Sequence, residues 1–177
     1  MRRICVFCGS HSGNKPAYAD LARETATAIV RAGFGIVYGG GSVGLMGVLA
    51  DAALAAKGEV IGVIPQALSR SEIAHAGLTR LHVVASMHER KALMAESSDG
   101  FIALPGGFGT MDELCEVLSW RQLGIHDKPI GVLDYAGYFR HLLALFDSMV
   151  REGFLEPANQ SLLVRAEGIE ELLAAMF

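Results

Sequence analysis

Short runs of apolar residues alternate with longer amphipathic segments along all 177 residues of the chain. Within the runs, apolar residues follow one another without polar interruption, as in strands that are buried on both faces. The predicted strands span residues 4–8, 34–38, 60–64, 81–85, 101–104, 129–133 and, more weakly, 162–164. The predicted helices span residues 16–31, 45–56, 87–98, 110–123, 138–152 and 169–177. This alternation predicts an α/β fold, a single-domain Rossmann-like doubly wound parallel sheet with helices on both faces.

Composition and charge narrow the class of protein. With 51% hydrophobic residues and 21 glycines, the chain is typical of a compact α/β protein, and we expect residues 1–177 to form a single Rossmann-like domain. A net charge of −4 gives no basic footprint for nucleic acid. The apolar run after Met1 is too short for a signal peptide, and none approaches the roughly 20 residues of a membrane span. We therefore expect a cytoplasmic protein.

Three turns rich in small residues follow predicted strands, at residues 9–13, 39–47 and 105–113. In a doubly wound sheet, ligands bind beyond the carboxyl ends of the strands, where these turns lie. Glycines let backbone N–H groups approach an anion, and a helix N-terminus adds partial positive charge. The turns predict a pocket for a phosphorylated ligand. The alternative is that the glycines serve only tight turns and close helix packing.

The second turn matches a dinucleotide fingerprint, but its context does not. Gly39, Gly41 and Gly44 have the G-x-G-x-x-G spacing between a strand and a helix. An NAD site also needs an acid at the end of the next strand, whereas Glu59 lies before that strand. Neither glycine turn ends in Gly-Lys-Ser/Thr, so a P-loop is not indicated either. A monophosphate-sized ligand fits better than a dinucleotide or a triphosphate.

Glu113 has two interpretations. Thr110 and Glu113 have the spacing of a capping box, in which Thr110 caps the helix and Glu113 reaches back to it. Alternatively, Glu113 is a catalytic carboxylate, and the nearby Asp112 and Glu116 favour this because acids gather at one helix opening. A helix start favours the ionised form, which suits an acceptor for ribose hydroxyls.

A second capping box, at Ser86 and Glu89, places Arg90 and Lys91 just past the first helical turn. Cations are mildly unfavourable there unless an anion binds nearby, and Arg offers a planar fork for phosphate or ribose oxygens. The alternative is a solvated basic pair.

Cysteines and histidines give no sign of a metal site. Cys5 and Cys8 form a CxxC within a predicted strand, where they would point to opposite faces and remain buried thiols. Cys115 stands alone, and the histidines lack ligand spacing. Met87 fits either an apolar pocket or the core.

Together these motifs resemble the LOG ("lonely guy") family of cytokinin riboside 5'-monophosphate phosphoribohydrolases, which are often mislabelled lysine decarboxylases. The resemblance rests on GGGSVGLMG at 39–47, SMHERK at 86–91 and PGGFGTxxE at 105–113, and continues through 120–129 and 152–155. It covers nearly the whole chain. His11 departs from the family, whose first turn more often reads Cys-Gly-Ser-Ser.

The resemblance implies hydrolysis of the N-glycosidic bond of N6-substituted adenosine 5'-monophosphates by a homodimer, without a metal or organic cofactor. It implies Arg90 as the catalytic partner of Glu113. Expected partners are a nucleoside monophosphate substrate and a second copy of the chain, and neither nucleic acid nor membrane. The expected substrate-binding residues are Gly9, Ser10, Gly40, Gly41, Gly44, Met87, Lys91, Gly106, Gly107, Gly109, Thr110 and Glu116.

Two other functions remain open at this stage. One is a general AMP or purine 5'-monophosphate nucleosidase, which differs only in the base pocket. The other is a non-catalytic nucleotide or cofactor carrier, like the related molybdenum-cofactor carriers. A carrier would need the glycine turns but neither Arg90 nor the Glu113 and Glu116 pair, so their joint presence favours an enzyme.

Overall fold

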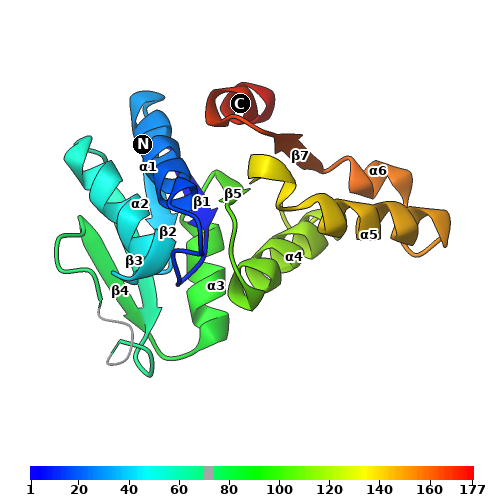
Figure 1. The fold of residues 1–177 in the computed structure, drawn as a ribbon. Helices are drawn as coiled ribbons and strands as arrows, with labels where there is room; N and C mark the ends of the chain where they lie inside the picture. The colour runs from blue at the N-terminus through cyan, green and yellow to red at the C-terminus, as the bar shows by residue number, and fades with distance from the viewer. Residues whose placement is uncertain (70–73) are drawn as a thin grey trace.

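A seven-stranded parallel sheet organises the computed structural model, which describes residues 1–69 and 74–177 (Figure 1). The order across the sheet is β4-β3-β2-β1-β5-β6-β7. The strands are β1 (Arg3–Phe7), β2 (Gly35–Tyr38), β3 (Val60–Pro65), β4 (Arg80–Val84), β5 (Gly100–Ala103), β6 (Ile130–Leu133) and β7 (Leu163–Ala166). Every predicted strand is confirmed, including the weak last one. The segment that joins β3 to β4 lies partly outside the described residues.

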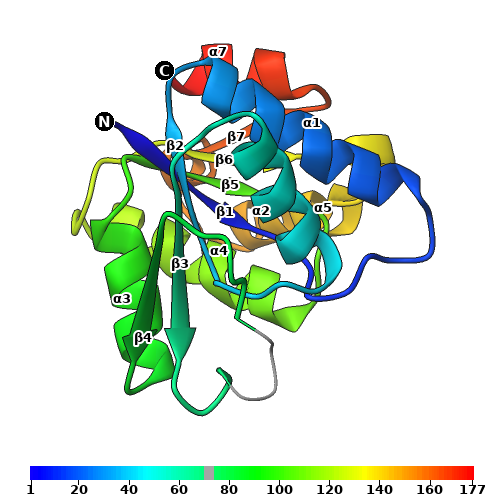
Figure 2. The same ribbon diagram turned by 90° about the vertical axis from the view of Figure 1, so that its left-hand side faces the viewer.

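Helices cover both faces of this sheet, as predicted (Figure 2). One layer contains α1 (Ala17–Arg31), α2 (Gly44–Ala55) and α7 (Ile169–Met176). The other contains α3 (Met87–Glu96), α4 (Phe108–Gln122) and α5 (Arg140–Arg151). The sequence did not indicate the short α6 (Pro157–Gln160) or the 3-10 turn η1 (Tyr135–Gly137). In Figure 1, α5 and α6 project from the body of the molecule.

Two hydrophobic cores lie on the two faces of the sheet. The strands β2, β3, β5 and β6 are buried along their whole length, because helices cover both of their faces. Cys5 belongs to the core under α3 and α4, whereas Cys8 belongs to the core under α1 and α2. Both are free buried thiols, which confirms the prediction made from their spacing.

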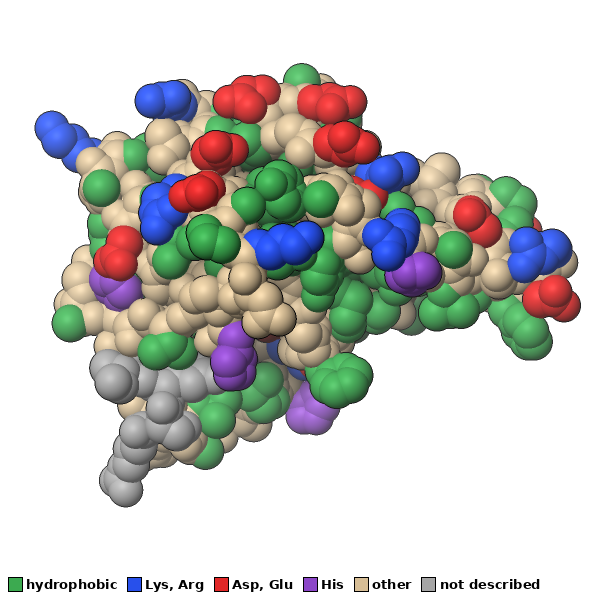
Figure 3. Space-filling model, viewed as in Figure 1, with side chains coloured by type: hydrophobic (Ala, Val, Ile, Leu, Met, Phe, Trp, Pro, Cys, Tyr) green, Lys and Arg blue, Asp and Glu red, His purple; other side chains and the backbone are tan. Residues whose placement is uncertain are grey.

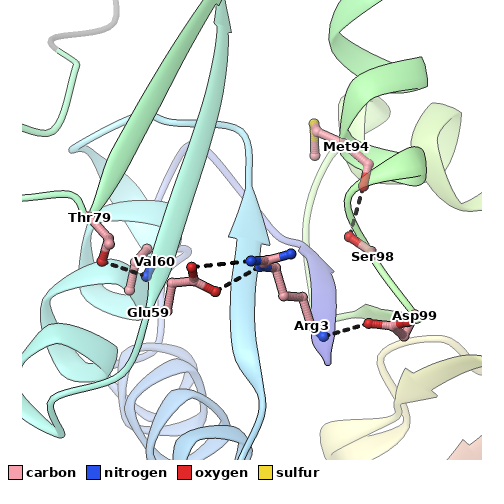
Figure 4. A network of polar contacts seen from close by, with 7 residues as sticks. All are labelled: Arg3, Glu59, Val60, Thr79, Met94, Ser98 and Asp99. Atoms are coloured by element: carbon pink, nitrogen blue, oxygen red, sulfur yellow. Dashed lines mark hydrogen bonds and ion pairs between the residues drawn. The ribbon is translucent and has the colours of Figure 1, made fainter. Parts of the chain in front are cut away.

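Polar contacts tie the amino ends of the strands together (Figure 4). The Nε of Arg3 lies 2.7 Å from Oε2 of Glu59, and the Arg3 backbone N–H donates to Asp99 Oδ2 at 2.7 Å. The hydrogen bond from Arg3 lowers the pKa of Glu59. Glu59 thus pairs with Arg3 at the amino end of β3. The ribose-binding acid of a dinucleotide site lies at the carboxyl end of that strand, so Glu59 does not have its position.

The carboxyl ends of β1 and β5 meet at the centre of the sheet, where the chain order reverses. This is the switch point at which doubly wound sheets bind ligands. The three predicted turns converge there, since the N–H of Gly9 donates to Pro105 O at 3.2 Å and the N–H of Leu45 donates to Gly9 O at 3.0 Å. The fold therefore gathers sequence-distant turns into one site.

The surface shows no broad basic patch on the face drawn in Figure 3, where acidic side chains gather along the upper edge and basic ones are scattered. Among the described residues, none of the helices is both long and apolar enough to cross a membrane.

Candidate active site

A cavity of about 530 Å³ opens at the switch point. The turns after β1 and β5, the end of β2 and the starts of α2, α3 and α4 surround it. Eight expected site residues line it, namely Gly9, Ser10, Arg90, Gly106, Gly107, Gly109, Thr110 and Glu113. Other residues line it that were not predicted as site residues, among them Tyr18, Leu45, Met46, Phe108 and Tyr138; His11 lines it as well.

The N-terminus of α4 faces this cavity. The helix begins at Phe108 with Gly107 as N-cap, not at Thr110, and no side chain caps it. The predicted capping box of Thr110 and Glu113 is therefore wrong, because Thr110 already lies within the first turn. The first N–H groups of a helix have no intrahelical acceptor. A Cβ atom on Gly107 or Gly109 would meet nothing within 4 Å, so an anion has room to approach the free N–H groups.

Gly106 shows why a glycine precedes this helix. A Cβ atom there would overlap the hydroxyl of Thr110, which is buried beneath the turn. The hydroxyl of Tyr138 donates a hydrogen bond to Gly106 O at 2.6 Å from the other side. The turn is thus held by a packed hydroxyl and by an incoming donor.

Glu113 lies one turn into α4 and borders the cavity. Its carboxylate has no hydrogen bond or salt bridge within the described ranges 1–69 and 74–177. Burial raises the pKa of Glu113 from an ordinary 4.5 to about 7, against the opposing effect of the Arg90 charge. From the sequence we expected the helix start to keep this carboxyl group ionised. It does not do so fully at neutral pH, because the desolvation that raises the pKa of Glu113 is the larger effect.

Arg90 is brought to the cavity by α3. Its helix begins at the predicted cap, since Ser86 Oγ accepts from the N–H of Glu89 at 3.1 Å. The Arg90 side chain is buried, and Nη2 donates to Gly39 O at 3.0 Å. The solvated alternative is therefore wrong for Arg90. A Cβ atom on Gly39 would overlap Nη2, so glycine makes room for the guanidinium.

The buried Nε of Arg90 has no hydrogen-bond partner among the residues that the structure describes. An unpartnered buried donor on a cation is costly, and a bound anion or hydroxyl would remove that penalty. Such perturbed groups beside a cavity indicate a functional site.

Lys91 points away from the main cavity. Its Nζ lies 3.0 Å from Asp112 Oδ2 and 3.1 Å from Glu116 Oε1. Although burial lowers the pKa of Lys91, the hydrogen bonds that its ammonium group donates to Asp112 and Glu116 raise it overall. A much smaller cavity, which Glu113, Lys91 and Glu116 help to line, lies behind the main one. Lys91 and Glu116 therefore stand behind Glu113, outside the lining of the main cavity.

Four other expected residues lie near the cavity without lining it. The second turn contributes Gly39, Leu45 and Met46 to the wall instead of its other glycines. Gly40 packs on Ile64, and Gly44 packs on the Ser10 backbone. Gly41 is paired with Ala74, and Met87 is exposed. Their proposed role in binding stays a prediction.

The described residues contain no group of three or more His, Cys, Asp or Glu side chains arranged to hold a metal ion.

Known proteins of similar sequence cover nearly the whole chain. A family described as "Possible lysine decarboxylase" matches residues 46–176. A rice (Oryza sativa subsp. japonica) relative, "Probable cytokinin riboside 5'-monophosphate phosphoribohydrolase LOGL1", is 51% identical over 174 residues, which are 98% of this chain and 78% of the relative. The Arabidopsis thaliana "Cytokinin riboside 5'-monophosphate phosphoribohydrolase LOG1" is 50% identical over 97% of this chain and 81% of its own length. The chain belongs to the LOG family.

Solved structures with the same fold are more distant from this LOG-family chain. The molybdenum cofactor binding protein of Rippkaea orientalis has a TM-score of 0.73 at 22% identity, covering 99% of this chain and 95% of the other. The Moco carrier protein of Chlamydomonas reinhardtii has a TM-score of 0.72 at 21% identity, with coverage of 99% and 95%. At these identities the likeness establishes the Rossmann-like fold alone.

Proposed function

We propose that this LOG-family protein hydrolyses the N-glycosidic bond of N6-substituted adenosine 5'-monophosphates, the cytokinin riboside monophosphates, to the free base and ribose 5-phosphate. The observation that carries the proposal is the identity of about half the residues, over nearly the whole chain, with relatives named for this activity. The cavity supports it, since an anion-accepting helix start, a cation and a carboxylate border one space.

The 5'-phosphate is placed at the start of α4. The free N–H groups after Gly107 and the partial positive charge of the helix favour an anion there. Gly9 and Gly106 touch through their turns, which brings the Ser10 hydroxyl to the same end of the cavity. The ribose then lies over the first turn of α4, toward Glu113.

Glu113 and Arg90 supply the chemistry. The bond between the ribose C1' and the base nitrogen breaks, and its electron pair leaves with the base, which takes up a proton. The sugar passes through an oxocarbenium-like state, which an ionised Glu113 stabilises by its negative charge. A water oxygen adds to C1', and Glu113 accepts the proton that this water loses. Glu113 then releases that proton to solvent, from which the departing base takes up its own proton, so that the reaction balances. The guanidinium of Arg90 donates to ribose or phosphate oxygens and keeps the pKa of Glu113 from rising further.

We also propose that the protein is a cytoplasmic homodimer and that residues 1–177 act as one catalytic domain. The family resemblance supports the dimer, and so do exposed apolar side chains near the projecting α5, such as Leu123, Leu145 and Phe154. Figure 3 shows hydrophobic side chains along the underside of this arm. Such an exposed group of apolar residues is typical of an interaction surface.

The test is an end-point assay of the purified protein with N6-isopentenyladenosine 5'-monophosphate, AMP and the unphosphorylated riboside. We expect free base from the first substrate and none from the riboside. Glu113→Gln should lower turnover by about 10²-fold or more while Glu24→Gln, an exposed carboxylate on α1, leaves it unchanged. Equal or faster release from AMP would make the protein a general nucleosidase. Binding of the monophosphate without any release would make it a carrier.

A further inference from the structure

One phenol hydroxyl reaches the phosphate turn from a distant part of the chain. Tyr138 lies 32 residues beyond Gly106, and its hydroxyl donates to Gly106 O at 2.6 Å. Both residues line the main cavity. The ring of Tyr138 also meets Tyr18 edge-on, with centroids 6.1 Å apart, and Tyr18 packs on the first turn at Gly13. Tyr138 therefore contacts the third turn directly and the first turn through Tyr18.

The buried carboxylate of Asp134, which pairs with the partly exposed Arg165, holds the segment that carries Tyr138. Asp134 is fully buried at the end of β6, and its Oδ1 accepts from the N–H of Phe139 at 2.7 Å. Its Oδ2 lies 2.7 Å from Nη2 of Arg165 on β7 and also accepts from Nε of that residue. Phe139 itself is buried in the core under α4. Both ends of the short segment are thereby fixed to the sheet.

The backbone between these anchors is strained. Ala136 has φ of 52°, in the left-handed region, and Gly137 follows with φ of 69°. A left-handed conformation is unfavourable for alanine, and a folded protein keeps it only where surrounding contacts require it. Here the strained turn reverses the chain after β6 and presents Tyr138 to the glycine turn.

The peptide bond between Gly106 and Gly107 explains what this hydrogen bond achieves. In a trans peptide, C=O and N–H point in opposite directions. A donor that fixes Gly106 C=O therefore also fixes the direction of the Gly107 N–H, which belongs to the N-cap residue of α4. Without that donor, neither flanking glycine has a side chain to hold the peptide plane.

We propose that Tyr138 is a positioning residue for the phosphate-binding turn and that its hydroxyl orients the Gly106–Gly107 peptide for the substrate's 5'-phosphate. This inference rests on the proposed function. It predicts an effect on phosphate recognition and not on bond cleavage, because Glu113 and Arg90 remain in place.

Tyr138→Phe tests it, since this variant keeps the ring and removes only the hydroxyl. We expect KM for the 5'-monophosphate, and the Kd of ribose 5-phosphate measured by calorimetry, to rise about three- to tenfold, with kcat nearly unchanged. Tyr135→Phe is the matched control, because no acceptor for its hydroxyl lies within the described residues and it does not line the cavity. Thermal unfolding of both variants checks the fold.

Three outcomes are distinct. An unchanged KM and an unchanged ribose 5-phosphate Kd in a folded Tyr138→Phe variant would overturn the inference and leave the proposed function intact. A lower kcat with unchanged ribose 5-phosphate affinity would also overturn it. Wild-type protein that neither binds ribose 5-phosphate nor releases base would refute the proposed function itself.

Discussion

Replacement of Glu113 by glutamine should stabilise the free protein at alkaline pH while it lowers turnover by about 10²-fold or more. Burial raises the pKa of Glu113 from 4.5 to about 7. The folded state thus holds a proton that the unfolded state releases near pH 4.5, so the free energy of unfolding falls as pH rises from about 4.5 to 7. Glutamine is nearly the same size and carries no charge, so its variant is spared this loss.

The size of the effect follows from the pKa difference. Each pKa unit corresponds to about 1.4 kcal/mol, so the full shift amounts to about 3 kcal/mol. Glu113 is only half-buried, and solvent reduces the figure to about 2–3 kcal/mol. For a chain of this length, that corresponds to a Tm higher by about 5–10 °C at pH 8, with little difference at pH 4.5.

Urea unfolding of both proteins between pH 4.5 and 8, without nucleotide, provides the measurement. The informative quantity is the difference in free energy of unfolding between variant and wild type, which should grow with pH and level off above about pH 7. Glu24→Gln, on the exposed face of α1, is the control and should show no such growth. A difference that stays constant over this pH range would refute a desolvated Glu113.

Two further substitutions test the surroundings of this carboxylate. Lys91→Met removes a positive charge that lowers the pKa of Glu113. The acidic limb of the kcat/KM profile, expected near pH 7 for the wild type, should therefore move to higher pH, and Lys91→Arg should restore its position. A limb that does not move in Lys91→Met would contradict an effect of the Lys91 charge on Glu113. Gly39→Ala forces a Cβ atom against Nη2 of Arg90 and should lower kcat/KM by at least about tenfold in a protein that still folds. Steady-state kinetics checks both, and wild-type rates in Gly39→Ala would show that Arg90 can move without consequence.

The alternation of apolar runs and helices was sufficient to predict the sheet, because strands buried on both faces need uninterrupted apolar residues. It could not predict η1, whose left-handed Ala136 contradicts local preference and exists only through the anchors at Asp134 and Phe139. The helix α4 begins at Phe108, two residues before the start predicted from the sequence. Thr110 and Glu113 have capping-box spacing, yet Gly107 takes the cap in an extended conformation and Thr110 packs under Gly106 instead.

The residues of the candidate site could be predicted where they belong to one contiguous motif. They could not be predicted where tertiary contacts determine which side chain reaches the cavity. Glu113 and the turn before it follow from one stretch of sequence. The burial of Arg90 does not, since Lys91 beside it has the same character in the sequence and pairs with Asp112 and Glu116 instead. Which of the two is buried depends on which side of α3 faces Gly39, where the missing Cβ atom leaves room for the Arg90 guanidinium. Tyr138 gave no signal because it lies 32 residues beyond Gly106 in the sequence and meets the turn only once β6 pairs with β5.

Several unfavourable features lie in or near the main cavity. Within the described part of the chain, Glu113 is desolvated without a hydrogen-bond or ion-pair partner and the Nε of Arg90 is buried without an acceptor, while Ala136, in the turn before Tyr138, is held in a left-handed conformation. Each lowers the stability of the free protein, whereas the opposite edge of the sheet pairs Arg3 with Glu59 closely. A fold retains such features when they act on a ligand. The gain in stability expected for Glu113→Gln is therefore the thermodynamic counterpart of the activity that the variant loses.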